Sequence, residues 1–198
     1  MAPILVNPDK VREFVDEASF EAWLTAHHDR EDEVWIKMHK VGSGRPCISQ
    51  KQAIDVVLCW GWIDGLRKRL DEDSFLLRFT PRRPRSVWSQ VNVANVVRLV
   101  AAGRMTPHGL REVEAAKADG RWARAYAAGE GMKIPDDLQA AIDAEPAARD
   151  MLARLNAKNR FALAFRVHHM KTEAGRRRKI ATFVEMLKRG ETIYPQKL

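Results

Sequence analysis

The hydrophobic periodicity of this chain changes near residue 80, and this change limits the folds that it can adopt. Before it, the apolar side chains of Val34, Ile36 and Met38 recur at every second residue, which is the period of a half-buried strand. Residues 66–70 and 75–79 flank a polar turn at 71–74 and predict a hairpin. After residue 80, apolar residues recur at helical spacing. This order of periods predicts an α+β fold.

Helix signals surround the predicted strands. Residues 19–28 predict a helix with Ser19 as its N-cap, and Ser49 with Gln52 forms a capping-box pattern that opens a second helix. Gly61 is placed to end that helix in a left-handed conformation. Short connections favour antiparallel pairing of the strands. We therefore expect N-terminal helices packed on a small antiparallel sheet, followed by an all-helical C-terminal region.

The C-terminal half reads as helical throughout. Ser86 or Ser89 starts a helix that ends at Gly103, and Thr106 with Pro107 starts another that ends near Gly120. Further helices are predicted over residues 122–128, 135–144, 145–156, 161–171 and 173–188. The predicted domains are an α+β domain at residues 1–104 and a helical region at residues 105–198, packed together as one compact unit.

The charge of the chain is uneven. Of 198 residues, 45% are hydrophobic, which suffices for a core, and the net charge is +8. Basic residues concentrate at 67–85 and 166–189, whereas acidic residues concentrate at 9–33 and 136–145. This asymmetry favours an anionic partner, which includes nucleic acid, anionic lipid and acidic proteins. The alternative interpretation is a solvated basic surface.

Several classes of protein are not indicated. No apolar run is long enough to predict a transmembrane helix, and residues 1–10 have no apolar core of a secretory signal, so we expect a cytoplasmic protein. Cys47 and Cys59 have the spacing of neither a redox pair nor a zinc site, and Cys59 is expected to be a small buried residue. The histidines lack metal-ligand spacing, and no cofactor fingerprint is present, so no metal and no cofactor are predicted.

The segment from residue 59 to residue 92 is the best candidate for a site. Arg82, Arg83 and Arg85 are flanked by prolines, which restrict the backbone and favour binding of a phosphate or carboxylate. Ser86, Ser89 and the start of the next helix would add donors. Alternatively, these arginines pair with the acidic residues of the hairpin turn at 71–73.

The other candidates in this segment are aromatic or polar. Asp64 follows Trp62 and either acts as an acid or base, bonds a local turn, or pairs with an arginine of residues 82–85. Trp60 is expected in the core, whereas Trp62 and Trp88 are assigned either to the core or to a pocket. The predicted ligand-binding set is Trp62, Asp64, Arg82, Arg83, Arg85, Trp88 and Asn92, and no residue is assigned a catalytic role.

The last predicted helix is basic and amphipathic. Residues 176–179 are Arg-Arg-Arg-Lys, and apolar residues at 180, 183, 184 and 187 share one face. We interpret it as a packed C-terminal helix with a solvated outer face, because its apolar stripe has the width of a normal core-facing one. Binding to anionic lipid or RNA is the alternative.

Four motifs together resemble a known family. They are residues 58–65 (LCWGWIDG), 78–92, 99–109 and 120–122 (GRW), and their order, spacing and tryptophans are similar to the YdeI/OmpD-associated (OmdA-like) family, whose members are often labelled bacteriocin-protection proteins. The resemblance implies a cytoplasmic bacterial protein linked to envelope stress and to tolerance of bacteriocins or cationic peptides. It brings no established reaction and no catalytic residues. Residues 171–176 (KTEAGR) depart from the lysine and Thr-Arg pattern of the family's tail.

Three hypotheses about function follow. The first is a non-catalytic stress-tolerance protein that binds an anionic small molecule or a protein partner through the Trp/Arg segment. The second is a small-molecule enzyme that uses Asp64 as acid or base. The third is a nucleic-acid-binding protein that uses both basic segments. The oligomeric state does not follow from the sequence.

Overall fold

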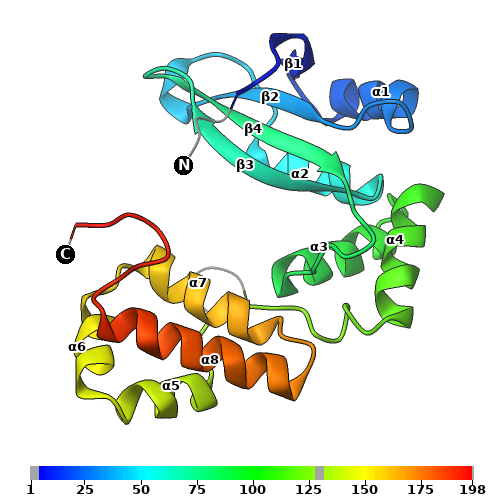
Figure 1. Cartoon of the computed structure of the whole chain (residues 1–198). Helices are drawn as coiled ribbons and strands as arrows, with labels where there is room; N and C mark the ends of the chain where they lie inside the picture. Colours follow the sequence, from blue (N-terminus) through cyan, green and yellow to red (C-terminus); the bar gives the residue numbers. More distant parts are fainter. Residues whose placement is uncertain (1–4, 128–131, 198) are drawn as a thin grey trace. The chain divides into compact units, whose positions relative to one another are not determined.

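The computed structural model of the chain describes residues 5–127 and 132–197. The chain divides into two compact units, of which the first ends at Ala125 and the second begins at Tyr126 (Figure 1). The sequence places the change to wholly helical structure at 104/105, whereas packing groups the next helix with the first unit. The two parts are called the N-terminal unit and the C-terminal unit below.

The N-terminal unit combines strands with helices, which confirms the predicted α+β class. In chain order its described elements are η1 (Pro8–Lys10), β1 (Val11–Arg12), α1 (Glu17–His27), β2 (Val34–His39), η2 (Val41–Ser43), α2 (Gln50–Cys59), β3 (Trp62–Arg69), β4 (Ser74–Pro81), α3 (Gln90–Ala101) and α4 (Pro107–Ala118).

The sheet has the strand order β1-β2-β4-β3. Strand β4 pairs antiparallel with both β2 and β3, so the predicted hairpin and the antiparallel pairing of the three longer strands are confirmed. The prediction of a wholly antiparallel sheet is wrong at its edge, where β1 runs parallel to β2. Strand β1 has two residues, which is too short to produce a recognisable alternation.

Helices α1 and α2 pack on the sheet and form the first hydrophobic core (Figure 1). Strand β2 contributes Val34, Ile36 and Met38, as its alternation predicted, and α1 contributes Phe20 and Leu24. All five are almost completely buried. Because a buried side chain of this size contributes about 1.5–3 kcal/mol, this face of the sheet is a major source of stability.

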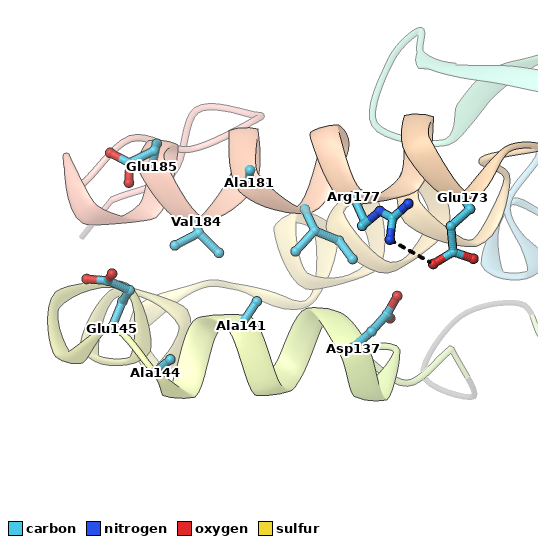
Figure 2. A pocket seen from close by; sticks show the side chains of 10 residues that line it. Asp137, Ala141, Ala144, Glu145, Glu173, Arg177, Ala181, Val184 and Glu185 are labelled. Carbon is cyan, nitrogen blue, oxygen red and sulfur yellow. Dashed lines mark ion pairs between the residues drawn. The ribbon is translucent and has the colours of Figure 1, made fainter.

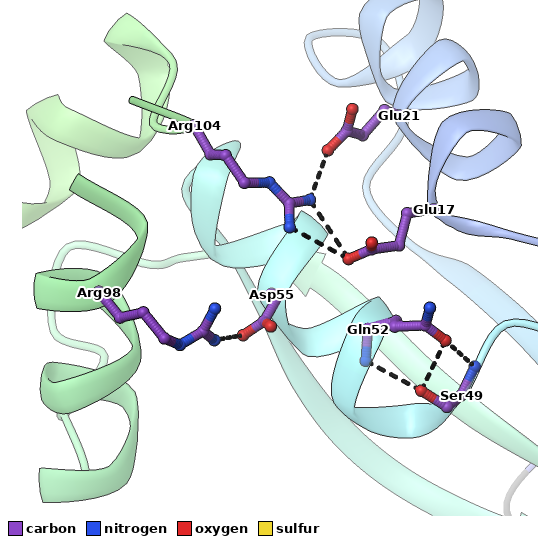
Figure 3. Close-up of polar contacts among 7 residues, drawn as sticks. All are labelled: Glu17, Glu21, Ser49, Gln52, Asp55, Arg98 and Arg104. Carbon is purple, nitrogen blue, oxygen red and sulfur yellow. Dashed lines mark hydrogen bonds and ion pairs between the residues drawn. The ribbon is translucent and has the colours of Figure 1, made fainter. Parts of the chain in front are cut away.

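The caps of the first two helices were partly predictable. Ser49 caps α2 and shares a capping box with Gln52, as expected (Figure 3). The predicted cap of α1 is wrong. Asp16 is the N-cap, and Ser19 is the third helical residue whose hydroxyl completes the box. An aspartate accepts this bond as well as serine does, so the helix begins two residues earlier than predicted.

Helices α3 and α4 pack on the other side of α2 and form a second core. Thr106 caps α4, and its hydroxyl donates a hydrogen bond of 2.6 Å to the carbonyl of Cys59. A Cβ atom on Gly109 would lie 2.3 Å from the same carbonyl oxygen. Only glycine therefore permits the start of α4 to sit this close to the end of α2.

Ion pairs connect α3 to α2, and the loop after α3 to α1 (Figure 3). Arg104 reaches Glu17 at 3.2 Å and Glu21 at 2.8 Å, both on α1. Arg98 on α3 lies 2.6 Å from Asp55 on α2, and the carboxylate of Asp55 is buried. Since a buried carboxylate without a partner is strongly destabilising, the Asp55 pair fixes α3 against α2.

The C-terminal unit is helical. Its described helices are α5 (Asp136–Asp143), α6 (Pro146–Arg154), α7 (Ala157–His168) and α8 (Glu173–Lys188). Residues Ile180, Phe183, Val184 and Leu187 of α8 are buried in the core of this unit, which confirms that α8 is a packed helix. Helix α8 has the predicted bounds, whereas α7 begins four residues earlier than predicted.

One predicted helix is absent from the described residues. Residues 121–124 form turns instead, and residue 128 lies outside the described part of the chain. Trp122 is held in the second core, and its amide donates to the carbonyl of Ala116. Packing of this tryptophan therefore replaces the short helix that the pattern at 122–128 predicted.

A buried asparagine holds the end of the chain on α7. Asn159 is fully buried, and its side-chain oxygen accepts a 2.8 Å hydrogen bond from the amide of Tyr194. Its side-chain nitrogen donates to the Tyr194 carbonyl at 3.0 Å and to Gln196 at 2.7 Å. Because a buried amide must be satisfied, these bonds order the segment after α8.

Among the helices within residues 5–127 and 132–197, none has both the length and the apolar character needed to cross a membrane.

Candidate functional site

The predicted arginine cluster lies between the end of β4 and the start of α3, on the turn at residues 81–88, called the arginine turn below. Its first arginine, Arg82, is buried and is not displayed as predicted. The Arg82 guanidinium lies 3.5 Å from the ring centroid of Trp88, and its Nη1 donates to the carbonyl of Val87 at 3.4 Å. Arg82 is therefore part of the scaffold of this turn.

Trp88 belongs to the second core. It is 1% exposed and packs with Leu99 and Val113, and its ring lies 5.0 Å from that of Trp122. Both the Arg82 guanidinium and the Trp122 ring contact the indole of Trp88. Of the two roles left open for Trp88, the structure shows the core role.

Arg83 and Arg85 are the displayed members of the turn. Both are exposed, and neither side chain makes a hydrogen bond or ion pair with another described residue. The backbone below them is fixed, because the amide of Ser86 donates to the carbonyl of Arg83 at 2.8 Å and the amide of Arg83 donates to the Ser86 hydroxyl at 3.0 Å. Two cations are thus held on a closed turn and face solvent.

The alternative was that acidic residues of the hairpin turn pair with these arginines. The hairpin turn instead uses Asp71 for its own hydrogen bonds. The carboxylate of Asp71 accepts hydrogen bonds from the amides of Asp73 and Ser74 and from the Ser74 hydroxyl. These bonds lower the pKa of Asp71, with the Ser74 hydroxyl as the largest cause. Asp71 is therefore used inside its own turn.

Sequence reasoning missed the residue that connects the arginine turn to the segment after α4. Arg121 lies just after α4, where its Nη1 donates to the Ser86 carbonyl at 2.9 Å and its Nε pairs with Asp119 at 2.6 Å. The signal was present, since Arg121 is the middle residue of the GRW motif at residues 120–122. The GRW motif therefore marks a contact with the arginine turn.

Asp64 lies on β3 opposite Phe79 of β4. Burial raises the pKa of this carboxyl, and the charge of Arg82 opposes the rise. The enzyme hypothesis requires two features, a perturbed pKa of Asp64 and a pocket lined by Asp64. The raised pKa is the first of these. Neighbouring Trp62 is 2% exposed and packs in the first core, so it does not offer its ring to a ligand.

Asn92, the last residue of the predicted set, and Cys59 are both at least partly buried. Asn92 is half-buried in the first turn of α3, and its backbone amide donates to the Ser89 hydroxyl at 3.1 Å. Cys59 is 1% exposed, and burial raises the pKa of its thiol to about 11. The prediction that Cys59 is a small buried residue is confirmed, and at neutral pH its thiol stays protonated and weakly nucleophilic.

The C-terminal unit contains a groove between α5 and α8 with a volume of about 550 Å³ (Figure 2). Small and apolar side chains line it, with Ala141 and Ala181 in its middle and Ala144 beside Glu145 at one end (Figure 2). Carboxylates lie at both ends, with Glu145 and Glu185 at one end and two others at the opposite end (Figure 2). The other two are Asp137 and Glu173.

All four carboxylates already have a cationic neighbour. Arg176 binds Asp137 through two nitrogens at 2.5 and 2.7 Å, and Lys188 lies 3.4 Å from Glu145 and 2.9 Å from Glu185. The pair between Arg177 and Glu173 is longer, at 3.8 Å. The groove is therefore an apolar channel bounded by exposed ion pairs.

Comparison with known proteins assigns each unit separately. The family model described as "Domain of unknown function (DUF8412)" matches residues 12–112, just over half of the chain. The model described as "Bacteriocin-protection, YdeI or OmpD-Associated" (OmdA) matches residues 131–190. The chain therefore belongs to the DUF8412 family and carries an OmdA region in its C-terminal unit. No curated protein and no solved structure shows significant similarity to the chain.

The predicted relationship to the YdeI/OmpD-associated family is confirmed, but its position differs from the expected one. The motifs at residues 58–65, 78–92 and 99–109 lie within the DUF8412 match. The OmdA match instead covers α5 to α8, including all residues that line the groove. The arginine turn and the groove thus belong to segments with different family descriptions.

Proposed function

We propose that this member of the DUF8412 family is a non-catalytic cytoplasmic binding protein whose arginine turn binds an anionic ligand or the acidic surface of a protein partner. One observation carries the proposal. Arg83 and Arg85 are exposed cations without partners among the described residues, on a turn fixed by hydrogen bonds. A guanidinium binds carboxylate or phosphate through two parallel hydrogen bonds, and a fixed backbone reduces the entropy lost on binding.

The surroundings of the turn support an anion rather than a neutral ligand. Arg82 belongs to the same turn, and Arg121 donates to the Ser86 carbonyl of this turn, so two further positive charges come from the turn and its contacts. One carboxylate, Asp119, offsets Arg121. The positive potential of such a cluster attracts an anion before contact and falls off with added salt.

A thermal-shift panel tests this proposal and names the ligand class. The panel contains inorganic phosphate, nucleotides, sugar phosphates, lipid headgroups, short oligonucleotides and an acidic peptide. A ligand that binds the arginine turn raises the Tm of the wild type and not that of the double variant Arg83→Ala/Arg85→Ala. The matched control is Arg45→Ala/Lys51→Ala, which removes two exposed cations elsewhere. Equal shifts in the wild type and both variants would contradict the proposal.

The nucleic-acid hypothesis is separated from the others in the same experiment. If oligonucleotides give the largest shift, their affinity should fall steeply with salt, because each neutralised phosphate releases a counterion. If the acidic peptide gives the largest shift, the partner is a protein. The enzyme hypothesis assigns Asp64 as the acid or base and predicts a ligand that contacts it. The thermal shift caused by this ligand should be lost in Asp64→Asn and retained in the double arginine variant.

The groove supports a second candidate function, which is the capture of a cationic amphipathic peptide. Its middle is apolar and lined by alanines, so a helix can approach closely (Figure 2). Its ends carry four carboxylates that are paired with three cations, Arg176, Arg177 and Lys188, so one negative charge is left in excess. All of its lining residues lie within the segment matched by the bacteriocin-protection model. A role in tolerance of bacteriocins or cationic peptides is therefore proposed for the C-terminal unit.

A steric substitution tests the groove without changing charge. Ala181 is exposed and lines the groove, whereas Ala174 is exposed on the same helix and does not line it. Ala181→Trp should abolish binding of a labelled cationic amphipathic helical peptide, as measured by fluorescence anisotropy. Ala174→Trp should bind like the wild type. If both variants bind equally well, the peptide contacts another surface and the groove has no such role.

A further inference from the structure

Two histidines and a tryptophan from three helices meet in the N-terminal unit. His28 is the C-cap of α1, Trp60 is the C-cap of α2, and His108 lies in the first turn of α4. The ring centroids of His28 and His108 are 4.0 Å apart. The Trp60 ring lies 4.8 Å from His28 and stacks on His108 at 5.7 Å with an interplanar angle of 14°. These three residues are called the histidine contact below.

The hydrogen bonds of the contact show the state of one nitrogen in each ring, and they require the His108 ring to be neutral. His28 Nδ1 lies 3.0 Å from the carbonyl of Leu24, and a carbonyl only accepts, so this nitrogen carries the proton. His108 Nδ1 lies 2.8 Å from Nη2 of Arg111, and a guanidinium only donates, so this nitrogen carries a lone pair. A proton added to Nδ1 of His108 would therefore point at an N–H group of Arg111.

The charged groups around His108 oppose its protonation. Arg111 lies on the same helix and His28 approaches from α1, whereas Asp29, directly after His28, favours the charged form. Glu112, which follows Arg111 in α4, lies against Gly61. Burial is the largest cause that lowers the pKa of His108, and the charges of His28 and Arg111 lower it further.

We propose that the histidine contact is a pH-sensitive cover over Trp60, which opens when His108 becomes protonated. A protonated His108 carries a positive charge beside Arg111, and its Nδ1 no longer accepts the hydrogen bond from the Arg111 guanidinium. The start of α4 is also held by Thr106 and Gly109 on Cys59, so the helix stays in place. The His108 ring then leaves the Trp60 face, and the indole, which is half-buried in the closed contact, becomes more exposed to solvent.

The sign of the pH dependence follows from the direction of the shift. The pKa of folded His108 lies below its ordinary value of 6.5. The folded state therefore binds fewer protons than the unfolded state in this range, and its stability falls as the pH decreases. The contribution of the contact is complete above pH 6.5 and is lost as the pH falls through the pKa of folded His108.

The test follows histidine titration by NMR and thermal unfolding of the whole chain between pH 7.5 and pH 5. His108 should titrate below 6.5, and its pKa should rise in His28→Gln and in Arg111→Gln because each variant removes a positive neighbour. The decrease in Tm on acidification should be smaller in His108→Gln than in the wild type by about 2–5 °C. His168→Gln is the control, because exposed His168 lies in the C-terminal unit, and it should decrease like the wild type.

A second readout follows the indole itself. The fluorescence difference between the wild type and Trp60→Phe isolates the signal of Trp60, and collisional quenching by acrylamide should increase as the pH falls. His28→Gln, which retains the capacity to bond Leu24, keeps the test valid if His108→Gln folds poorly. The proposal is overturned if His108 titrates at or above 6.5, or if quenching of Trp60 is independent of pH.

Discussion

The arginine turn and the α5–α8 groove offer different features to a ligand, which are exposed charge in the turn and apolar space in the groove. In the turn, Arg83 and Arg85 have no charged partner within residues 5–127 and 132–197, and the backbone of the turn is fixed by Ser86 and Arg121. In the groove, Arg176 and Lys188 already neutralise neighbouring carboxylates, and the distinctive feature is an apolar channel. The turn should therefore respond to loss of charge, whereas the groove should respond to loss of space.

The largest expected effect comes from removing the support of the arginine turn. Trp88→Ala deletes a buried indole on which Arg82 stacks, so the free energy of unfolding should decrease by about 3–5 kcal/mol. Chemical denaturation measures this change. Arg83→Ala alters only an exposed side chain and should stay within about 0.5 kcal/mol of the wild type. A stable Trp88→Ala variant would show that the turn does not depend on the second core.

The groove offers a matched pair of adjacent arginines. Arg176→Ala removes a two-nitrogen contact with Asp137 and a hydrogen bond to the Val167 carbonyl, and should cost about 1 kcal/mol given the partial exposure of the pair. Arg177→Ala breaks only an exposed pair at 3.8 Å. Its stability should match that of the wild type within the error of urea unfolding. Equal losses in both variants would mean that the rim of the groove is not organised as described.

The smallest expected effect concerns Asp64. Because burial raises the pKa of this carboxyl, the folded state binds its proton more tightly, and the contribution of Asp64 to stability falls as the pH rises through the folded pKa. Asp64→Asn removes this penalty and should raise the Tm by about 2 °C at pH 7. The difference should disappear below the ordinary pKa of 3.8, which thermal unfolding at several pH values measures. A lower Tm at pH 7 would show that the Arg82 charge outweighs burial.

Local signals predicted much of the fold. The alternation of Val34, Ile36 and Met38, the capping box of Ser49 and Gln52, and the cap at Thr106 all appear in the structure as expected. The failures are places where tertiary packing decides. Trp122 enters the second core and replaces a helix by turns, and β1 forms only because β2 is available beside it.

The candidate site was located more accurately than it was interpreted. The sequence indicated the segment correctly, but it could not separate Arg82 from Arg83 and Arg85, because all three have the same residue type and similar proline neighbours. The contact of Arg82 with Trp88 is made by residues six positions apart across a turn, which no periodicity predicts. The groove and the histidine contact were missed because each joins helices distant in the sequence.

The central claim is that one turn contains supporting and binding arginines, and one comparison tests it most directly. For the anion identified by thermal shift, isothermal titration calorimetry on Arg83→Ala/Arg85→Ala should show an affinity at least about tenfold weaker than that of the wild type. Urea unfolding of the same sample should show unchanged stability. The Arg45→Ala/Lys51→Ala control should bind with an affinity close to that of the wild type. Retained affinity in the arginine variant, or equal loss in the control, would contradict the account.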